Sequence, residues 1–275
     1  MLKSKTYVIT GSTSGIGKEL VKVFSKNPKN VVFAGYRNSA KIPPNLEKNV
    51  INFYIDMTDR VSIANAVEFI KSKIDRVDTL INVAGCVTAG PIENIDTNRL
   101  REQFDVNTFS HIELTQGLVD ILDNGRIINI SSMASFGNFP FISPYCASKR
   151  ALDIFFNAFS LENHRNIKVV SIKPGVIATP IWGKSVESNW QYLDSCKDYE
   201  KELNFIKNNA LKNSNCGLDV SHVAKVVLQV DRMKNPKPSY TVGYDAMFAK
   251  ILSLMPQGVV NKLIKIGMKS RISKS

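Results

Sequence analysis

A short apolar run, a glycine-rich turn and a helical pattern follow one another at the start of the chain, and this order constrains the fold more than any other feature. The run Thr6-Tyr7-Val8-Ile9-Thr10 has the composition of a strand that is buried on both faces. The turn is Gly11-Ser12-Thr13-Ser14-Gly15-Ile16-Gly17, and a helix is expected over Lys18 to Lys26. Small residues let the backbone approach a pyrophosphate, and a helix N-terminus supplies free N–H groups. The pattern predicts a nucleotide site, with an unliganded βα turn as the alternative.

Further apolar runs alternate with helical patterns along the rest of the chain. We expect strands at Val31–Gly35, Val50–Ile55, Val77–Asn82, Gly125–Ser132, Ile167–Ile172 and Tyr240–Gly243. Helices are expected after a cap at Thr58 or Asp59, over Asn94–Leu122 with a break near Asn107, and over Pro144–Asn163. The alternation predicts a Rossmann-like, doubly wound parallel sheet with helices on both faces. Ligands of such sheets bind at the carboxyl ends of strands, where we place Gly11, Asn82, Ser132 and Pro174.

The chain shows no composition shift or linker, so we expect a single domain over residues 1–275. Within it, residues 181–217 form a helical insertion on the substrate side, and residues 246–275 form a C-terminal helical extension. The chain starts without an apolar leader, and no apolar run is long enough to span a bilayer. The unpaired spacing of Cys86, Cys146, Cys196 and Cys216 predicts free thiols, so we expect a cytoplasmic protein. No metal-ligand cluster is expected, and His111, His164 and His222 have no partner spacing.

The net charge of +12 is distributed unevenly. No acidic residue follows Asp245, whereas six basic residues do: Lys250, Lys262, Lys265, Lys269, Arg271 and Lys274. Apolar residues of the same segment predict two short amphipathic helices around Pro256-Gln257-Gly258. Three uses of this extension stay open: a lid over the pocket, contact with an anionic membrane surface, and a subunit interface. A nucleic-acid site is not expected, because no aromatic–basic stripe accompanies the charge.

A tyrosine and a lysine lie four residues apart at the start of the helix expected at Pro144, in Tyr145-Cys146-Ala147-Ser148-Lys149. This spacing places both side chains on one helical face. A neighbouring ammonium favours the phenolate, so we expect Lys149 to lower the pKa of Tyr145 toward neutral pH. Such a phenol can exchange a proton with a carbonyl or alcohol oxygen. The pair also occurs by chance on solvated helices, so its meaning depends on its surroundings.

The end of the second expected strand indicates which dinucleotide the chain binds. An acid at this point would bind the ribose 2′-hydroxyl of NAD, but the sequence here is Tyr36-Arg37-Asn38. An arginine can hold a 2′-phosphate through two parallel hydrogen bonds, which favours NADP(H) over NAD(H). After the third strand, Asp56 and Met57 are candidates for the adenine side, although an Asp in a turn needs no ligand to explain it.

Together these motifs resemble the short-chain dehydrogenase/reductase family over almost the whole chain. Thr10-Gly11-x-x-x-Gly15-Ile16-Gly17 matches the cofactor turn of that family, and Asn82-Val83-Ala84-Gly85 is similar to its Asn-Asn-Ala-Gly motif, with Val replacing the second Asn. Tyr145 and Lys149 match the catalytic pair, and Ser132 stands thirteen residues before the tyrosine, where the family keeps its serine. Asn107 matches the asparagine that interrupts a helix, and Pro174-Gly175 with Thr179 matches the segment that holds the nicotinamide carboxamide.

The resemblance implies an NADP(H)-dependent alcohol dehydrogenase or carbonyl reductase. Hydride would pass between the nicotinamide C4 and a substrate carbon while Tyr145 handles the proton on the oxygen. Ser132, preferred over Ser131 for its spacing, would orient that oxygen, Lys149 would also bind the nicotinamide ribose, and Asn107 would hold a water. The implied cofactor-binding residues are Gly11, Ser12, Ser14, Gly15, Ile16, Gly17, Arg37, Asp56, Met57, Asn82, Ala84, Gly85, Tyr145, Lys149, Pro174, Gly175 and Thr179.

The substrate is less constrained than the cofactor. The extension is similar to those of the retinol, 17β-hydroxysteroid and 3-hydroxybutyrate dehydrogenase branch, which implies a lipophilic substrate such as a steroid or retinoid. A small polar substrate, such as a 3-hydroxy acid or a sugar, is the alternative. A non-catalytic NADP(H)-sensing protein is a second alternative, although such relatives usually lose the Tyr or the Lys. The resemblance also implies a homodimer or homotetramer built from the helices before and after the fifth strand.

Overall fold

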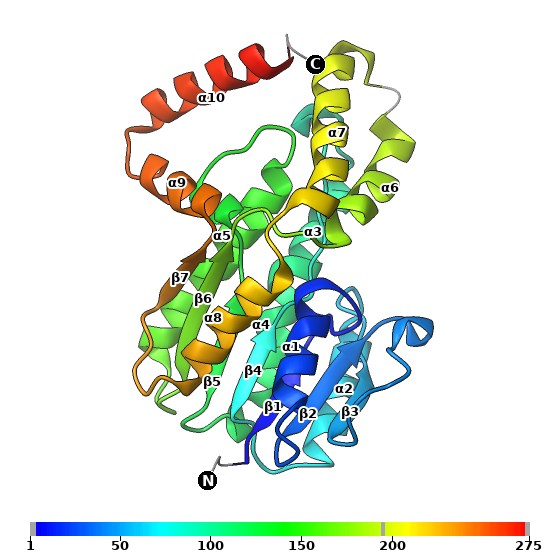
Figure 1. The fold of residues 1–275 in the computed structure, drawn as a ribbon, viewed down its shortest axis with the longest axis vertical. Helices are drawn as coiled ribbons and strands as arrows, with labels where there is room; N and C mark the ends of the chain where they lie inside the picture. The colour runs from blue at the N-terminus through cyan, green and yellow to red at the C-terminus, as the bar shows by residue number, and fades with distance from the viewer. Residues whose placement is uncertain (1–3, 194–195, 273–275) are drawn as a thin grey trace.

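The computed structural model describes residues 4–193 and 196–272, and a seven-stranded parallel sheet runs through the centre of the molecule (Figure 1). The strand order is β3-β2-β1-β4-β5-β6-β7. The strands are β1 (Thr6–Ile9), β2 (Val31–Tyr36), β3 (Val50–Tyr54), β4 (Thr79–Asn82), β5 (Arg126–Ile130), β6 (Lys168–Pro174) and β7 (Ser239–Val242). The chain order reverses between the neighbours β1 and β4. A crevice at the carboxyl ends of these two strands is the usual ligand site of such sheets.

Helices cover both faces of the sheet (Figure 1). They are α1 (Gly15–Ser25), α2 (Arg60–Lys71), α3 (Thr97–Phe104), α4 (Ser110–Leu118), α5 (Ser143–Glu162), α6 (Ile181–Leu193), α7 (Glu200–Cys216), α8 (Val220–Arg232), α9 (Tyr244–Leu252) and α10 (Gln257–Ile272). Short 3-10 turns η1, η2, η4, η5 and η6 lie at Ser39–Lys41, Ile92–Asn94, Val119–Ile121, Met133–Phe136 and Lys197–Tyr199, and a π-helical turn, η3, spans Asp105–Phe109. Helices α1 and α8 share one core cluster with the sheet, and α2, α4 and α5 share the other.

The alternation of side chains along β1 shows why a continuous apolar run is needed in this sheet. Tyr7 and Ile9 belong to the cluster beneath α1 and α8, whereas Val8 belongs to the cluster on the opposite face. Successive side chains of a strand point to opposite faces, so both sets must be apolar when helices cover both. The predicted Rossmann-like parallel sheet is therefore confirmed.

Several predicted element bounds need correction. Helix α1 begins at Gly15 instead of Lys18, so its amino end lies inside the glycine turn. The break expected near Asn107 is the π-helical turn, which separates α3 from α4. Helix α8 was not predicted at all. The extension does contain two helices, but α10 has 16 residues and is not short. Lys274, one of the six basic residues of the extension, lies outside the described residues.

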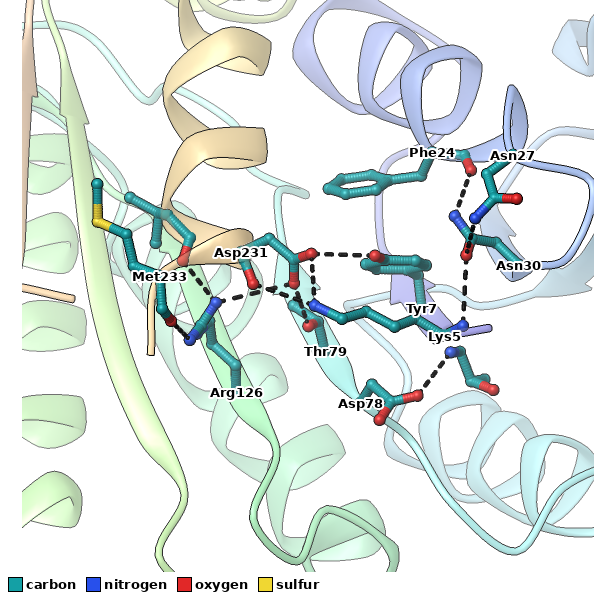
Figure 2. A network of polar contacts seen from close by, with 12 residues as sticks. Lys5, Tyr7, Phe24, Asn27, Asn30, Asp78, Thr79, Arg126, Asp231 and Met233 are labelled. Carbon is teal, nitrogen blue, oxygen red and sulfur yellow. Dashed lines mark hydrogen bonds and ion pairs between the residues drawn. The ribbon is translucent and has the colours of Figure 1, made fainter. Parts of the chain in front are cut away.

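A buried carboxylate joins α8 to the amino-terminal edge of the sheet (Figure 2). Asp231 Oδ2 accepts hydrogen bonds from Lys5 Nζ at 2.9 Å and from Tyr7 OH at 3.0 Å, and its Oδ1 accepts one from Thr79 Oγ1 at 2.7 Å. The Arg126 guanidinium lies 3.9 Å from the same carboxylate and donates to the carbonyls of Val230 and Met233. The network therefore links β1, β4 and β5 to the end of α8, at the edge opposite the expected ligand site.

No helix in the described part of the chain has the length and apolarity that a membrane crossing requires.

Candidate active site

The glycine turn after β1 adopts a conformation that other residues would not tolerate. Gly11 and Gly15 have φ of +64° and +52°, in the left-handed region where side chains are strained. A Cβ on Gly17 would collide with the carbonyl oxygen of Gly11. Because α1 begins at Gly15, and Gly15 and Ile16 line a cavity, the amino end of this helix borders that cavity. Such an end favours the phosphates of a dinucleotide.

The cavity has a volume of about 490 Å³ and lies where β1 to β6 end. Most of the predicted cofactor and proton-transfer residues line it. They are Gly11, Ser14, Gly15, Ile16, Arg37, Asp56, Met57, Ala84, Gly85, Ser132, Tyr145, Lys149, Pro174, Gly175 and Thr179. These residues come from segments that are far apart in the sequence, and the fold brings them together around one cavity.

Four predicted site residues lie behind this lining: Ser12, Gly17, Asn82 and Asn107. Ser12 donates its backbone N–H and its hydroxyl to the carbonyl of Gly35, at 3.0 and 2.7 Å, and so fastens the glycine turn to β2. The Asn82 amide donates to Asn129 Oδ1 at 2.8 Å, between β4 and β5. Their observed contacts support the walls of the site, and direct contact with a ligand stays a prediction for all four.

The loop after β4 is held against the glycine turn by a threonine. The Thr10 hydroxyl oxygen accepts hydrogen bonds from the backbone N–H groups of Val83 and Ala84, at 2.9 and 3.1 Å. A Cβ on Gly11 would come within 3.0 Å of the Ala84 Cα, so the two segments are in backbone contact. The other side of the loop rests on the buried His111, whose Nε2 donates to the Ala84 carbonyl at 2.9 Å. Burial and the nearby Lys149 ammonium lower the pKa of His111 to about 3, so this imidazole is neutral.

Asn107 connects the same loop to helix α5. Its side-chain oxygen accepts from the Cys86 N–H at 2.9 Å, and its NH₂ group donates to the Cys86 carbonyl and to Ser148 Oγ, at 3.0 and 3.1 Å. The residue is fully buried in the π-helical turn. Its side chain therefore fixes the positions of the loop and the helix, while its expected role in holding a water remains a prediction.

Lys149 lies at the floor of the cavity with its ammonium almost fully buried. Its Nζ donates to the Ile130 carbonyl at 2.9 Å, and a Cβ on Gly85 would lie only 3.6 Å from it. Burial lowers the pKa of Lys149 to about 8, because the ammonium loses its water, while the negative charge of Asp153 acts in the opposite direction. Asp153, one helical turn further along α5, is also paired with Lys173 at 2.7 Å.

The phenol of Tyr145 behaves differently from our expectation. Burial raises the pKa of Tyr145 to about 12, and the hydrogen bond with the Ser132 side chain opposes this rise without cancelling it. The predicted lowering by Lys149 is therefore wrong for this structure. The physical reason is that moving a phenolate out of water costs more free energy than the hydrogen bond with Ser132 recovers. The phenol keeps its proton at neutral pH.

The structure also distinguishes the two serines at the end of β5. Both line the cavity, but it is the Ser132 side chain that hydrogen-bonds with Tyr145. The Ser132 hydroxyl oxygen is fixed further by the Ala134 N–H, which donates to it at 3.1 Å. The buried Ser131 hydroxyl has no hydrogen-bond partner among the described residues. The catalytic role of Ser132 stays a prediction.

The Pro174-Gly175 segment lies between the glycine turn and the first turn of α9. A Cβ on Gly15 would come within 3.1 Å of the Thr179 methyl group. On the other side, the Asp245 carboxylate accepts a hydrogen bond from the Val176 N–H at 2.6 Å and leaves no room for a Cβ on Gly175. Sequence reasoning missed this contact of Asp245, because the residue lies about seventy positions after Gly175.

Positive charge gathers where Arg37 lines the cavity. The pKa of Lys184 is lowered by burial and then by the positive charges of Lys41 and Arg37, so these three cations lie close enough to repel one another. Lys184 belongs to α6 and also lines the cavity. A site that concentrates cations in this way favours an anionic ligand group. The sequence analysis singled out Arg37 alone, because nothing in the local pattern around Lys184 links it to the second strand.

The insertion forms one wall of the cavity through α6. Ile181, Trp182, Ser185 and Ser188 line it, and the Asn189 side chain joins α6 to the loop after β4 through the Val87 carbonyl and the Ala89 N–H, at 2.9 and 3.0 Å. The aromatic residues of the insertion divide between two roles: Trp182 faces the cavity, whereas Trp190 packs with Leu193, Cys196 and Leu203 in a small core. Arg99 and Glu102 of α3, which were not predicted, add charge to the lining.

Comparison with known proteins gives a consistent result. A family model described as short chain dehydrogenase matches residues 5–190. An NADPH-dependent 3-dehydrocapnine reductase of Ornithobacterium rhinotracheale is 30% identical over 98% of this chain and 99% of its own. A 3-ketodihydrosphingosine reductase of Bacteroides thetaiotaomicron is 28% identical over 96% of this chain and 98% of its own. Among solved structures, a short-chain dehydrogenase from Burkholderia cenocepacia in complex with NADP has a TM-score of 0.75 at 20% identity, over 95% of this chain and 98% of its own.

Proposed function

Because the chain belongs to the short-chain dehydrogenase/reductase family, we propose that it uses NADP(H) to interconvert a carbonyl and an alcohol on a lipophilic substrate, with Tyr145 as the proton donor and acceptor. The observation that carries the proposal is the contact between Tyr145 and Ser132 in the wall of a cavity whose floor holds Lys149. NADPH supplies the hydride, and the residues of the chain supply orientation and the proton.

The protonation states favour reduction over oxidation. With a pKa of about 12, Tyr145 carries its proton at neutral pH and can donate it to the carbonyl oxygen as that oxygen gains negative charge. The Ser132 hydroxyl is placed to hydrogen-bond the same oxygen. The buried Lys149 ammonium, held by the Ile130 carbonyl at 2.9 Å, would bind the nicotinamide ribose. The printed names of both relatives, which are those of reductases, support the same direction.

The residues of this chain fit NADP(H) along the whole cavity. Gly15 and the amino end of α1 would hold the pyrophosphate, Arg37 with Lys184 the 2′-phosphate, and Pro174-Gly175 the nicotinamide side. The conformational demands at Gly11 and Gly15, and the close approach of Gly175 to Asp245, keep this cradle free of side chains. No acid of the kind that binds the ribose of NAD follows β2.

Arg37→Asp is expected to reverse the cofactor preference. Losing a charge-assisted contact weakens binding by about ten- to a hundredfold, and the new carboxylate repels the 2′-phosphate further. The ratio of kcat/KM for NADPH to kcat/KM for NADH measures the effect. Lys29→Asp is the matched control, because it makes the same charge change at the exposed opposite end of β2. An unchanged ratio in Arg37→Asp would show that Arg37 does not select the cofactor.

The substrate proposal rests on the walls of the cavity beyond Tyr145. Val87, Ile181 and Trp182 give an apolar surface, and the two relatives act by name on 3-dehydrocapnine and on 3-ketodihydrosphingosine, the second a ketone of a lipid. A keto lipid is therefore our first choice within the lipophilic class, which also includes steroids and retinoids. Arg99 and Glu102 favour the alternative, a small polar substrate such as a 3-hydroxy acid or a sugar.

A panel of ketones separates these substrate classes. NADPH oxidation is followed by its absorbance with keto lipids, ketosteroids, retinal, 3-keto acids and sugars, each at several concentrations. We expect the highest kcat/KM for a keto lipid. A preference for small acids or sugars would overturn the substrate proposal while leaving the cofactor and the roles of Tyr145 and Ser132 intact.

Self-association is proposed through α4 and α5, the helices on either side of β5. Phe109, next to α4, and Ile154 and Phe155 on α5 are large apolar side chains that are exposed in the single chain. A second copy placed on these helices would bury them, as expected for a homodimer or homotetramer.

A further inference from the structure

Helix α9 exposes its large apolar side chains to solvent. A helix that packs only on its own fold would bury them. Its buried residues are Ala246 and Ala249, and it packs against η5. The opposite face and the turn after it carry large apolar side chains at helical spacing. These are Tyr244, Met247, Phe248, Ile251, Leu254 and Met255, whose residue exposures range from 39 to 96%. Apolar residues three and four apart form one continuous stripe, and here this stripe faces solvent.

Helix α10 carries a second exposed apolar stripe. Val259, Leu263 and Ile266 are exposed at a spacing of four and three residues, so they share one face, while Val260 is buried. Lys262, Lys265 and Lys269 follow this apolar face along one side and are exposed as well. Lys250 adds a fourth positive charge on α9, and no acidic residue follows Asp245. After Asp245, the two helices therefore expose apolar side chains together with charged side chains that are all basic.

The helices α9 and α10, which with the turn between them carry this apolar-basic surface, lie at the end of the molecule to which the strands point (Figure 1), and residues at the carboxyl ends of strands line the cavity. Asp245, at the start of α9, contacts the Gly175 segment of the cavity wall, and α10 contacts α7, which packs against α6. A partner bound to this surface would therefore lie near the wall of the cavity that contains Trp182.

We propose that the apolar-basic surface docks the protein on an anionic lipid bilayer. Exposed apolar side chains flanked by lysines are the pattern of helices that lie in the bilayer interface, with the apolar residues in the acyl region and the ammonium groups at the headgroups. A second copy of the chain fits less well, because a twofold contact through this surface would bring the lysines of both copies together without any acid to balance them. The proposal does not depend on the identity of the substrate.

Vesicle sedimentation of the full chain tests the docking. The protein is mixed with vesicles of phosphatidylcholine and phosphatidylglycerol, and in parallel with vesicles of pure phosphatidylcholine. We expect binding to the anionic vesicles that weakens with added salt and is at least tenfold weaker on the neutral ones. Failure to sediment with the anionic vesicles would overturn the proposal.

Two variants with matched controls assign the binding to this surface. K262E/K265E/K269E is compared with K26E/K29E/K48E, which makes the same charge change on exposed lysines far from the extension. F248S/L254S is compared with V61S/I92S, which removes equally exposed apolar side chains from other segments. We expect an at least tenfold loss of vesicle binding in each surface variant and no loss in its control, with circular dichroism unchanged.

Two results would contradict this assignment. Equal losses of vesicle binding in the variants and their controls would show that binding depends on the overall charge and apolarity of the protein and not on this surface. If sedimentation velocity shows that the surface variants dissociate an oligomer while vesicle binding is unchanged, the occupant of the surface is a second copy and the bilayer proposal is wrong. Both readouts are independent of turnover, so they stand apart from the test of the proposed function.

Discussion

Tyr145→Phe is expected to lower kcat for carbonyl reduction by about 10²- to 10⁴-fold, the range that a positioned general acid contributes. The substitution removes one oxygen from a fully buried ring and leaves its packing with Val87, Ala134 and Cys146 in place. The protonated phenol is the group that faces the cavity beside Ser132, so the reacting carbonyl oxygen would lose its proton source. NADPH affinity, measured by the fluorescence of the bound cofactor, should change little.

A matched control separates this effect from the general loss of a tyrosine hydroxyl. Tyr54→Phe removes the hydroxyl of an exposed tyrosine on β3 and should leave kcat unchanged. Ser132→Ala should lower kcat, whereas Ser131→Ala should matter less, because only the Ser132 side chain hydrogen-bonds with Tyr145. Retention of more than a tenth of the activity in Tyr145→Phe, or a larger effect of Ser131→Ala than of Ser132→Ala, would show that the proton comes from elsewhere.

Asp231→Ala is expected to lower the free energy of unfolding by about 3–5 kcal/mol, the cost of breaking a buried charge pair by removing one partner. The carboxylate accepts hydrogen bonds from Lys5, Tyr7 and Thr79, and Arg126 lies close to it. Burial and the negative charge of Asp231 together raise the pKa of Tyr7, so the phenol acts there as a neutral donor. Without the carboxylate, these donors and cations lose their common acceptor. Unfolding in urea measures the change.

The matched control is Asp123→Ala, which breaks an ion pair with Arg165 at 2.8 Å on the surface. Both partners of that pair are about half exposed, so water screens the ion pair and we expect a much smaller loss than in Asp231→Ala. Asp231→Asn keeps the shape and removes the charge, and we expect an intermediate loss. If Asp231→Ala costs no more than Asp123→Ala, the network does not carry the stability that its burial indicates. Turnover of the folded Asp231→Ala fraction should be normal, because the network lies at the opposite edge of the sheet.

The strands and the glycine turn could be predicted because their requirements are local. A strand covered on both faces needs an apolar run, and a turn with positive φ at Gly11 and Gly15 needs glycine, so both features leave a signal within a few residues. The break at Asn107 and the pairing of Tyr145 with Lys149 on one helix follow from the same kind of short-range pattern.

Helix α8 was missed for a physical reason. Its buried face includes Val223, Val227 and Val230, which are β-branched and have low intrinsic helix propensity. The spacing of four and three residues was nevertheless present in the sequence and would have revealed the helix. Tertiary packing against α1, β6 and β7 decides the conformation here.

The direction of the Tyr145 pKa and the roles of Lys184 and Asp245 could not be derived from the sequence. The pKa depends on how completely the phenol is buried, which is a property of the folded chain. Lys184 comes within the electrostatic influence of Arg37 and Lys41 only in the folded chain, and Asp245 meets Gly175 only because β6 and β7 are neighbours. Contacts between segments so far apart in the chain leave no local pattern.

The contact between Asp245 and Gly175 also limits how this chain could be recombined with its relatives. The carboxylate fills the space that a side chain at Gly175 or at Gly243 would need, and it accepts the hydrogen bond of the Val176 N–H. The two glycines and the acid must therefore be exchanged together, although Gly175 lies about seventy residues before the other two. In a chimera whose junction falls after Ala246, these three residues stay together, and the segment that carries most of the apolar-basic surface can be exchanged without changing their contacts.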